Sequence, residues 1–436
     1  MAQPAMARWL IWAVVGLATI AVGVWGALSL WDSTTVPSNL TLPHLQARDY
    51  FTAADLHRAS SFENFLHIDA FLAQDALVLA LAFYSRWGPR LVRESAAGRI
   101  GTGFLLGMLG FGVVWIAQLP FGLAAQIWEH EHGISKVDYL SWAVNDWFGL
   151  GSKFIFVCLA LLIAMGFAGL TRRYWWALAA PTFVALAALA TFTTPFLLPS
   201  LRPLRGQLLK ADAALFARRE GVPGVKVKVQ NVHELTTAPN AESAGLGPTR
   251  VVVLWDTLLH GRFSRKEIDA ILAHEFGHLS HDHLLKGIGW TAIFAFPLAF
   301  LIALATRRRG GIYAPTAVPT ALLAYVLVQL AFLPAHNLIS RHFEAEADWS
   351  SLQATHDPAA AQAMFVKLAR LSRAEPSESG LVKALFEDHP AIIDRLAMIK
   401  AWEQRHPAAV PAASRPAVTP GAGSAPARSG ASGRGR

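Results

Sequence analysis

The sequence predicts a mainly α-helical protein, in which a bundle of about seven transmembrane helices carries a small α+β domain. Three observations favour this fold class. Of the 436 residues, 53% are hydrophobic and only 16% are charged, a balance typical of integral membrane proteins. Apolar runs of the length needed to cross a bilayer recur along the chain. Two polar segments between and after them combine histidines with acidic residues.

Residues 1–198 are expected to form five membrane spans. Four apolar runs are clear, and they lie at 10–31, 103–126, 154–171 and 176–198. A fifth run, 70–87, is weaker because Asp75 interrupts it. An acidic residue at membrane depth must be paired or face a wet interior, so this stretch could instead lie in the membrane interface. The first run is long and lacks a convincing small-residue cleavage site, which favours a retained helix over a signal peptide.

The segment 199–285 has the pattern of a soluble catalytic segment. A helix is expected over 206–219, and the strict alternation of Val and Lys over 225–229 predicts a half-buried strand. A second strand is predicted at 251–254, followed by a helix. These elements predict a small sheet packed on a helix.

The helix after the second strand contains His274-Glu275-Phe276-Gly277-His278 and begins at a capping box formed by Ser264 and Glu267. The two histidines are four residues apart, so they lie one turn above the other and can share one metal ion. Glu275 lies beside them and can take a proton from metal-bound water. Such a pattern can also occur by chance on a surface or core helix, so a third ligand is needed to decide between the two interpretations.

The third ligand is expected in a second, helical catalytic segment, 340–405. A transmembrane hairpin at 286–339 precedes it and returns the chain to the same side of the membrane, because a hairpin contains an even number of spans. Glu344 and Asp348 are four residues apart and share a helix face. Glu344 could bind zinc with the two histidines, while Asp348 could hydrogen-bond a ligand. On their own these acids would be interpreted as a solvated face.

The H-E-F-G-H motif, followed by S-R-x-x-E-x-x-x-D at 340–348, resembles the membrane-embedded zinc metalloproteases of the CAAX prenyl protease type 1 family. It also resembles their relatives, the heat-shock membrane proteases. The resemblance covers roughly residues 45–402 and is most specific over 240–395. It implies a zincin-like catalytic domain with one Zn²⁺ per chain. The ligands that it implies are His274, His278 and Glu344.

The same resemblance implies roles for further residues. It makes Glu275 the general base and Asp348 a second acid in the site, and it assigns oxyanion stabilisation to His389 and Arg395. The substrate-binding strand would contain Asn240, Ala241 and Gly245. Two more positions are notable. Glu242 stands where the family often has an aromatic residue, so the side-chain preference of the groove is expected to differ. His283, expected on the continuing zinc helix, matches a recurring family histidine without an assigned role.

The predicted activity is that of a zinc metalloendopeptidase, which hydrolyses peptide bonds with zinc-activated water. The resemblance implies CAAX-type processing of C-terminal or membrane-tethered peptides, lipidated proteins among them. One alternative is a membrane-protein quality-control protease of the heat-shock type, which shares the chemistry and differs in substrate. A second alternative, from another class, is a non-catalytic zinc-binding membrane scaffold, which would have no need of Glu275.

Charge and composition define the expected partners and location. The tail 406–436 is rich in Pro, Ala, Gly, Ser and Arg and is expected to be disordered, and it contributes to the net charge of +8. No motif of interleaved aromatic and basic residues supports nucleic-acid binding, whereas anionic membrane lipids suit these charges. The single cysteine, Cys158, excludes an intrachain disulfide. We therefore expect a multi-pass integral protein of the cell or inner membrane.

The side of the membrane that carries the catalytic segments is open. Arginine-rich loops near 86–99, 172–173 and 307–309 share the side of the N-terminus in a seven-span arrangement. The positive-inside rule makes that side cytoplasmic and puts the catalytic segments opposite. The family resemblance implies the reverse, with the catalytic segments facing the cytosol.

Overall fold

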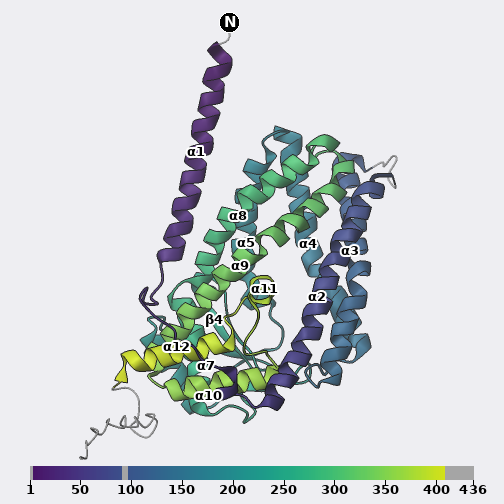
Figure 1. Cartoon of the computed structure of the whole chain (residues 1–436). Coiled ribbons are helices and arrows are strands. Elements are labelled where there is room, and N and C mark those ends of the chain that lie inside the picture. The colour runs from purple at the N-terminus through teal and green to yellow at the C-terminus, as the bar shows by residue number, and fades with distance from the viewer. Residues whose placement is uncertain (1–2, 91–96, 408–436) are drawn as a thin grey trace, which may run out of the picture.

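The computed structural model describes residues 3–90 and 97–407. Long helices form a bundle that stands on a smaller domain, and the N-terminus lies at the opposite end of the molecule from that domain (Figure 1). The tail expected to be disordered lies, from residue 408 onward, outside the described residues.

Long helices make up the bundle. They are α1 (Gln3–Asp32), α2 (Ala53–Trp87), α3 (Gly98–Glu131), α4 (Tyr139–Thr171), α5 (Trp175–Leu197), α8 (His283–Thr306) and α9 (Val318–Thr355). Five of them, α2, α3, α5, α8 and α9, are long and apolar enough to cross a membrane by length and composition. The other two expected spans correspond to α1 and α4, in which shorter apolar helices, Gly16–Asp32 and Ile155–Thr171, lie among the residues searched. The weak run at 70–87 lies within α2, one of the five.

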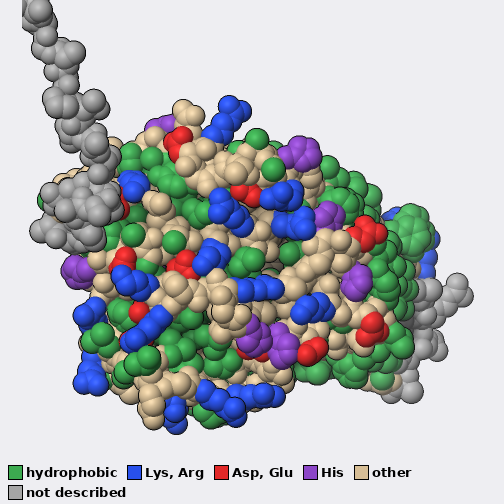
Figure 2. All heavy atoms as spheres, turned by 90° about the horizontal axis from the view of Figure 1, so that it is seen from below, with side chains coloured by type: hydrophobic (Ala, Val, Ile, Leu, Met, Phe, Trp, Pro, Cys, Tyr) green, Lys and Arg blue, Asp and Glu red, His purple; other side chains and the backbone are tan. Residues whose placement is uncertain are grey.

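The outer surface of the bundle is apolar. Large hydrophobic side chains such as Leu79 in α2, Ile116 in α3 and Leu189 in α5 are more than half exposed. Contact with lipid tails explains this exposure, since water-soluble proteins rarely expose extended apolar surfaces. Seen from the domain end, Lys and Arg side chains are scattered over the face, and hydrophobic side chains dominate its margin at the right (Figure 2). The chain is a multi-pass membrane protein.

The domain contains a four-stranded sheet with the order β1-β2-β4-β3. Its strands are β1 (Leu201–Pro203), β2 (Lys226–Gln230), β3 (Ala241–Ala244) and β4 (Val251–Trp255), and α6 (Gln207–Arg219) follows β1. β2 and β4 are parallel, and β1 and β3 pair antiparallel with them as the edge strands. The four residues 251–254 of β4 are at most 3% exposed, which suits a central strand made of Val and Leu. Both predicted strands and the helix at 206–219 are present within one residue of their predicted limits.

The helix α7 (Arg265–Ser280) begins at the predicted capping box, in which Ser264 and Glu267 bond each other reciprocally. It packs its apolar side chains against the sheet and against α9. We expected His283 on a continuation of this helix, and this expectation is wrong. α7 ends at Ser280, and Asp282 has a left-handed backbone (φ 53°), so His283 is the first residue of α8.

The helix α9 is continuous for 38 residues, from its apolar first half to the acidic motif. It therefore crosses the expected boundary between 339 and 340 without a break. The chain then forms α10 (Pro358–Ser372), α11 (Gly380–Leu385) and α12 (Ile392–Arg405). In Figure 1, α10 and α12 lie across the lower end of the molecule, below the long helices of the bundle. Trp402 of α12 and Phe276 of α7 are fully buried in the shared core.

Candidate metal centre

Three predicted ligands converge where α7 meets α9. The Nε2 atoms of His274 and His278 lie 3.1 Å apart. Glu344 on α9 completes the group, with Oε1 at 3.2 Å from His278 Nε2 and Oε2 at 3.4 Å from His274 Nε2. Two atoms that each lie about 2.0–2.1 Å from a tetrahedral zinc ion are themselves about 3.3–3.4 Å apart. The three side chains therefore fit a zinc ion in their observed arrangement.

Gly277 allows this convergence. A Cβ atom at this position would lie 3.2 Å from Ser350 Cβ and 3.3 Å from Ala347 Cα, so a side chain here would require α9 to move away by a few tenths of an ångström. The approach brings Glu344, one turn before Ala347 on α9, level with the two histidines. The glycine of H-E-F-G-H thus contributes to the site through the packing of two helices.

The second ring nitrogen of His274 faces an acid. Its Nδ1 lies 2.9 Å from Asp348 Oδ1, and Asp348 in turn accepts hydrogen bonds from Arg395. Burial alone would lower the pKa of His274, but Asp348 and Glu344 outweigh it and raise the pKa to about 10. The site therefore favours a positive charge at this position, which a bound divalent cation also supplies.

Glu275 is held by a residue that the sequence analysis did not single out. The hydroxyl oxygen of Ser243 in β3 lies 2.9 Å from Glu275 Oε2 and 2.7 Å from the Glu275 carbonyl oxygen, so its single proton is shared between these two acceptors. The bond fixes the carboxylate next to the metal ligands and joins the edge strand to α7. A lone serine in a strand belongs to no motif, so only the pairing of β3 beside α7 identifies it.

The two residues expected to stabilise an oxyanion lie in different surroundings. The side chain of His389 is 56% exposed, and its Nε2 lies 3.6 Å from Glu344 Oε2. Burial of the ring lowers its pKa, but Asp388 and Glu344 together raise it. Arg395 is buried, with Nε and Nη2 on Asp348 and Nη2 also 3.4 Å from Glu344. His389 is therefore open to a substrate, whereas the donors of Arg395 face protein carboxylates.

The expected substrate strand lies at the edge of the sheet. Ala241 is the first residue of β3, and the exposed Asn240 precedes it and accepts a backbone bond from Trp255. Gly245 has φ 88°, and a Cβ there would lie 2.4 Å from the Thr249 carbonyl oxygen, so it shapes the turn that ends β3. No described strand pairs with the outer edge of β3.

A second group of possible ligands, His233, Asp256 and His260, has a simpler explanation. Asp256 Oδ1 accepts the backbone N–H groups of Val232 and His233, and Oδ2 lies 2.5 Å from His233 Nδ1. These bonds hold a turn against the end of β4, and His260 is exposed. The group at α7 and α9 is the one that consists of the predicted ligands and is largely buried.

Comparisons with known proteins agree with this architecture. The model of peptidase family M48 matches residues 203–403. The uncharacterized metalloprotease YhfN of Bacillus subtilis is 24% identical over 90% of this chain and 96% of its own length. A CAAX prenyl protease 1 homolog of Arabidopsis thaliana is 24% identical over 79% of this chain and 86% of its own length. A protease HtpX homolog of Methylibium petroleiphilum is 28% identical over 38% of this chain, which covers only 65% of that relative.

Among solved structures, S. mikatae Ste24p has the same fold. The two match with a TM-score of 0.64 at 19% sequence identity, over 89% of this chain and 98% of Ste24p. A helical membrane bundle joined to an H-E-x-x-H helix, with a glutamate ligand on α9, defines a membrane metalloprotease. Over residues 203–403, which contain all three candidate ligands, the chain is similar to peptidase family M48.

Proposed function

We propose that this protein is a zinc metalloendopeptidase that cleaves C-terminal or membrane-tethered peptides, lipidated proteins among them. The observation that carries the proposal is the position of Glu275 beside three ligand atoms spaced 3.1–3.4 Å apart. His274, His278 and Glu344 would hold one zinc ion. Such an ion lowers the pKa of a bound water towards ~7 and polarises the scissile carbonyl.

Three other residues have roles in proton transfer, oxyanion binding and positioning of the carboxylates. Glu275, oriented by Ser243, takes the proton of the attacking water and passes it to the leaving amine. His389 is exposed at the rim, so its ring can donate a hydrogen bond to the oxyanion. For Arg395 we propose a role other than the oxyanion stabilisation that the resemblance implied. Because its guanidinium already binds Asp348 and Glu344, we assign it to positioning these carboxylates.

The edge strand β3 supports an extended mode of substrate binding. Its outer edge has no strand partner among the described residues, and Ser243 links the strand directly to Glu275. A peptide that pairs with this edge would lie straight across the metal ligands. Asn240, Ala241 and Glu242 would then be the residues nearest to the substrate.

Relatives favour CAAX-type processing over quality control. The matches to the Arabidopsis CAAX prenyl protease 1 homolog and to Ste24p extend over most of both chains. The match to the HtpX homolog covers 38% of this chain. The scaffold alternative requires no base, yet Glu275 is present and its carboxylate lies within hydrogen-bond distance of the Ser243 hydroxyl.

The decisive experiment compares the wild-type protein with Glu275→Gln in detergent. Bound zinc and cleavage of a farnesylated C-terminal peptide are measured, with the unmodified peptide of the same sequence as control. We expect one zinc per chain in both proteins, and a rate that falls by roughly 10²–10⁴ in the variant. Bound zinc in the wild type without cleavage of either peptide would favour the quality-control function. Equal cleavage by the wild type and Glu275→Gln would point to a contaminating protease and support the scaffold alternative.

We place the catalytic domain on the cytoplasmic side, as the family resemblance implies. The positive-inside rule would instead place the arginine-rich loops at the other end of the molecule in the cytoplasm. In a chain with Cys158→Ser, cysteines at the exposed positions Glu234 and Arg308 would lie on opposite sides. A membrane-impermeant maleimide applied to intact cells should label Arg308→Cys and spare Glu234→Cys until the membrane is permeabilised. The reverse pattern would put the domain outside and confirm the positive-inside rule for this chain.

A further inference from the structure

A buried hydrogen-bond chain extends from His278 away from the metal-ligand atoms. The Nδ1 atom of His278 lies 2.9 Å from His283 Nδ1, and His283 Nε2 lies 3.0 Å from Glu346 Oε2. His283 and Glu346 are 4% and 1% exposed. Neither residue can reach a substrate from this position, so their interaction with the site passes through His278.

The acceptor Glu346 determines which atom donates in each of these hydrogen bonds. An ionised carboxylate only accepts hydrogen bonds, and Glu346 also receives the N–H of Thr35 at 2.6 Å and the ammonium of Lys286 at 3.2 Å. His283 must therefore donate from Nε2. A neutral His283 then has its lone pair on Nδ1, so His278 must donate from its own Nδ1. This arrangement leaves the lone pair of His278 on Nε2, the atom that faces His274 and Glu344.

We propose that His283 and Glu346 are positioning residues, which hold His278 in the tautomer and orientation that bind the metal. The inference rests on the proposed function. The Nδ1 atom of His274 faces the carboxylate of Asp348 directly. The Nδ1 atom of His278 reaches the carboxylate of Glu346 only through the imidazole of His283. Outer partners of this kind typically contribute about 10–100-fold to metal affinity.

The chain segment after α1 closes the network. Thr35 bonds one oxygen of Glu346, and Lys286 bonds both the other oxygen and the carbonyl of Ser33 at 2.6 Å. The bond between Thr35 and Glu346 joins residues 311 positions apart in the sequence. The N-terminal segment is therefore part of the support of the metal site, although it contains no ligand.

Two substitutions at His283 separate hydrogen bonding from shape. The ring of His283 stacks on Phe343 with centroids 4.6 Å apart, and His283→Phe preserves this stacking while removing the acceptor. His283→Gln restores an acceptor for His278 and a donor for Glu346. The matched control is His342→Phe, since His342 stacks on Trp31 at 4.2 Å on the same helix as Phe343 and has no bond to the network.

Zinc affinity is measured by competition with a chromophoric chelator, and Co²⁺ absorption reports the geometry of the ligands. We expect the Kd for zinc to rise about 10–100-fold in His283→Phe and to change less than about threefold in His283→Gln and His342→Phe. Should His283→Phe not fold, Glu346→Leu, which removes the last acceptor, should weaken zinc in the same way. Wild-type affinity in His283→Phe, or equal losses in the control, would overturn the proposal. Neither result depends on cleavage, so a failure here is distinct from a failure of the proposed protease activity.

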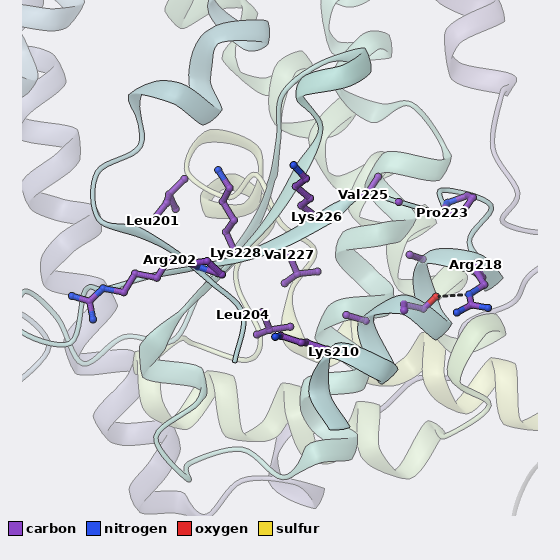
Figure 3. Close-up of a pocket in the computed structure, with 15 residues that line it drawn as sticks. Leu201, Arg202, Leu204, Lys210, Arg218, Pro223, Val225, Lys226, Val227 and Lys228 are labelled. Atoms are coloured by element: carbon purple, nitrogen blue, oxygen red, sulfur yellow. Dashed lines mark hydrogen bonds between the residues drawn. The ribbon is translucent and has the colours of Figure 1, made fainter. Parts of the chain in front are cut away.

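A second inference concerns a groove between β1, β2 and α6, with a volume of about 720 Å³. Its floor is apolar and includes Leu204, Ala213 and Val227. No acidic residue lines it, and none of its five basic residues forms an ion pair with a described carboxylate. These basic residues are Arg202, Lys210, Arg218, Lys226 and Lys228. In Figure 3, the side chains of Lys226 and Lys228 both point upwards from β2.

We infer that this groove binds anionic phospholipid. β1 begins four residues after α5 ends at Leu197, so the groove lies next to the end of a membrane span. Phe196 and Leu197 at that end and Leu208 on α6 are each more than 60% exposed. Cations beside exposed apolar side chains match an anionic headgroup attached to acyl chains.

The test compares two variants that lose equal charge at opposite ends of the molecule. One is Lys210→Gln/Lys226→Gln/Lys228→Gln, and the control is Arg307→Gln/Arg308→Gln/Arg309→Gln. Each is reconstituted in nanodiscs of phosphatidylcholine with phosphatidylglycerol, and the retained lipid is measured by native mass spectrometry. We expect retained phosphatidylglycerol to fall at least about threefold in the lysine variant only. Equal retention in both variants would overturn the inference, as would equal displacement of the lipid from both by inorganic phosphate.

Discussion

Arg395 and Asp348 form a buried ion pair with two hydrogen bonds, from Nε at 2.7 Å and from Nη2 at 2.5 Å. Asp348 Oδ1 also lies 2.9 Å from His274 Nδ1, so the pair stands directly behind a metal ligand. Arg395 comes from α12 and Asp348 from α9. The C-terminal helix is thereby tied to the metal site by charge as well as by apolar packing.

Removing one member of this pair should be costly. Arg395→Met leaves Asp348 buried without its cation, and we expect it to reduce the free energy of unfolding by about 3–5 kcal/mol. The double variant Arg395→Met/Asp348→Asn should recover part of this loss because no unpaired charge remains. Thermal unfolding in detergent measures both. A double variant less stable than Arg395→Met would contradict the explanation.

Ser243 should matter for turnover and not for metal binding. Ser243→Ala removes the hydroxyl that contacts Glu275, and we expect kcat to fall about tenfold, the equivalent of one hydrogen bond of about 1.4 kcal/mol. Zinc content should stay at the wild-type level. The control is Ser280→Ala. Ser280 lies on α7, the helix of Glu275, and its hydroxyl contacts Glu220 and the Gly277 carbonyl oxygen. A matching loss of kcat in the control would point to a general disturbance of α7.

Glu242 should set a preference for basic substrates. It lies on β3 next to the proposed peptide, and burial, together with the charge of Glu275, raises its pKa. Glu242→Gln should lower kcat/KM for peptides with lysine near the scissile bond and raise it for peptides with glutamate there. The exposed Glu234→Gln provides the control. An unchanged lysine-to-glutamate ratio would show that Glu242 does not face the substrate.

Glu378 should make stability depend on pH. Burial and the nearby carboxylates of Glu387 and Glu63 raise its pKa from 4.5 to about 8. An acid with a higher pKa in the folded chain binds its proton more tightly there, so stability is lost as the pH rises from about 4.5 to 8. Glu378→Gln should therefore unfold at a higher temperature than the wild type at pH 8, with a smaller difference at pH 5. A difference that is the same at both pH values would exclude this linkage.

Local patterns in the sequence predict much of the fold. The capping box of Ser264 and Glu267, the alternation in β2 and the apolar runs each depend on neighbours within a few residues. The four-residue spacing of His274 and His278 likewise fixes their relative position once the helix is known. Glu344 could be predicted because its helix repeats the same spacing with Asp348.

Tertiary contacts explain what the sequence could not predict. The break lies at Asp282, which has a left-handed backbone and accepts a bond from Arg250, 32 positions earlier, a contact that no local pattern encodes. Ser243 gains its importance only because β3 lies beside α7. Thr35 reaches Glu346 across 311 positions through a backbone N–H, which no side-chain pattern encodes.

The unbroken course of α9 connects the metal site to the membrane-spanning part of the same helix. From Val318 to Glu344 the helix rises about 39 Å, so a change of about 3° in its tilt relative to α7 would displace Glu344 by about 2 Å. Transmembrane helices respond to bilayer thickness by tilting. We therefore expect the affinity of the site for its metal to depend on the thickness of the bilayer, and so on lipid composition.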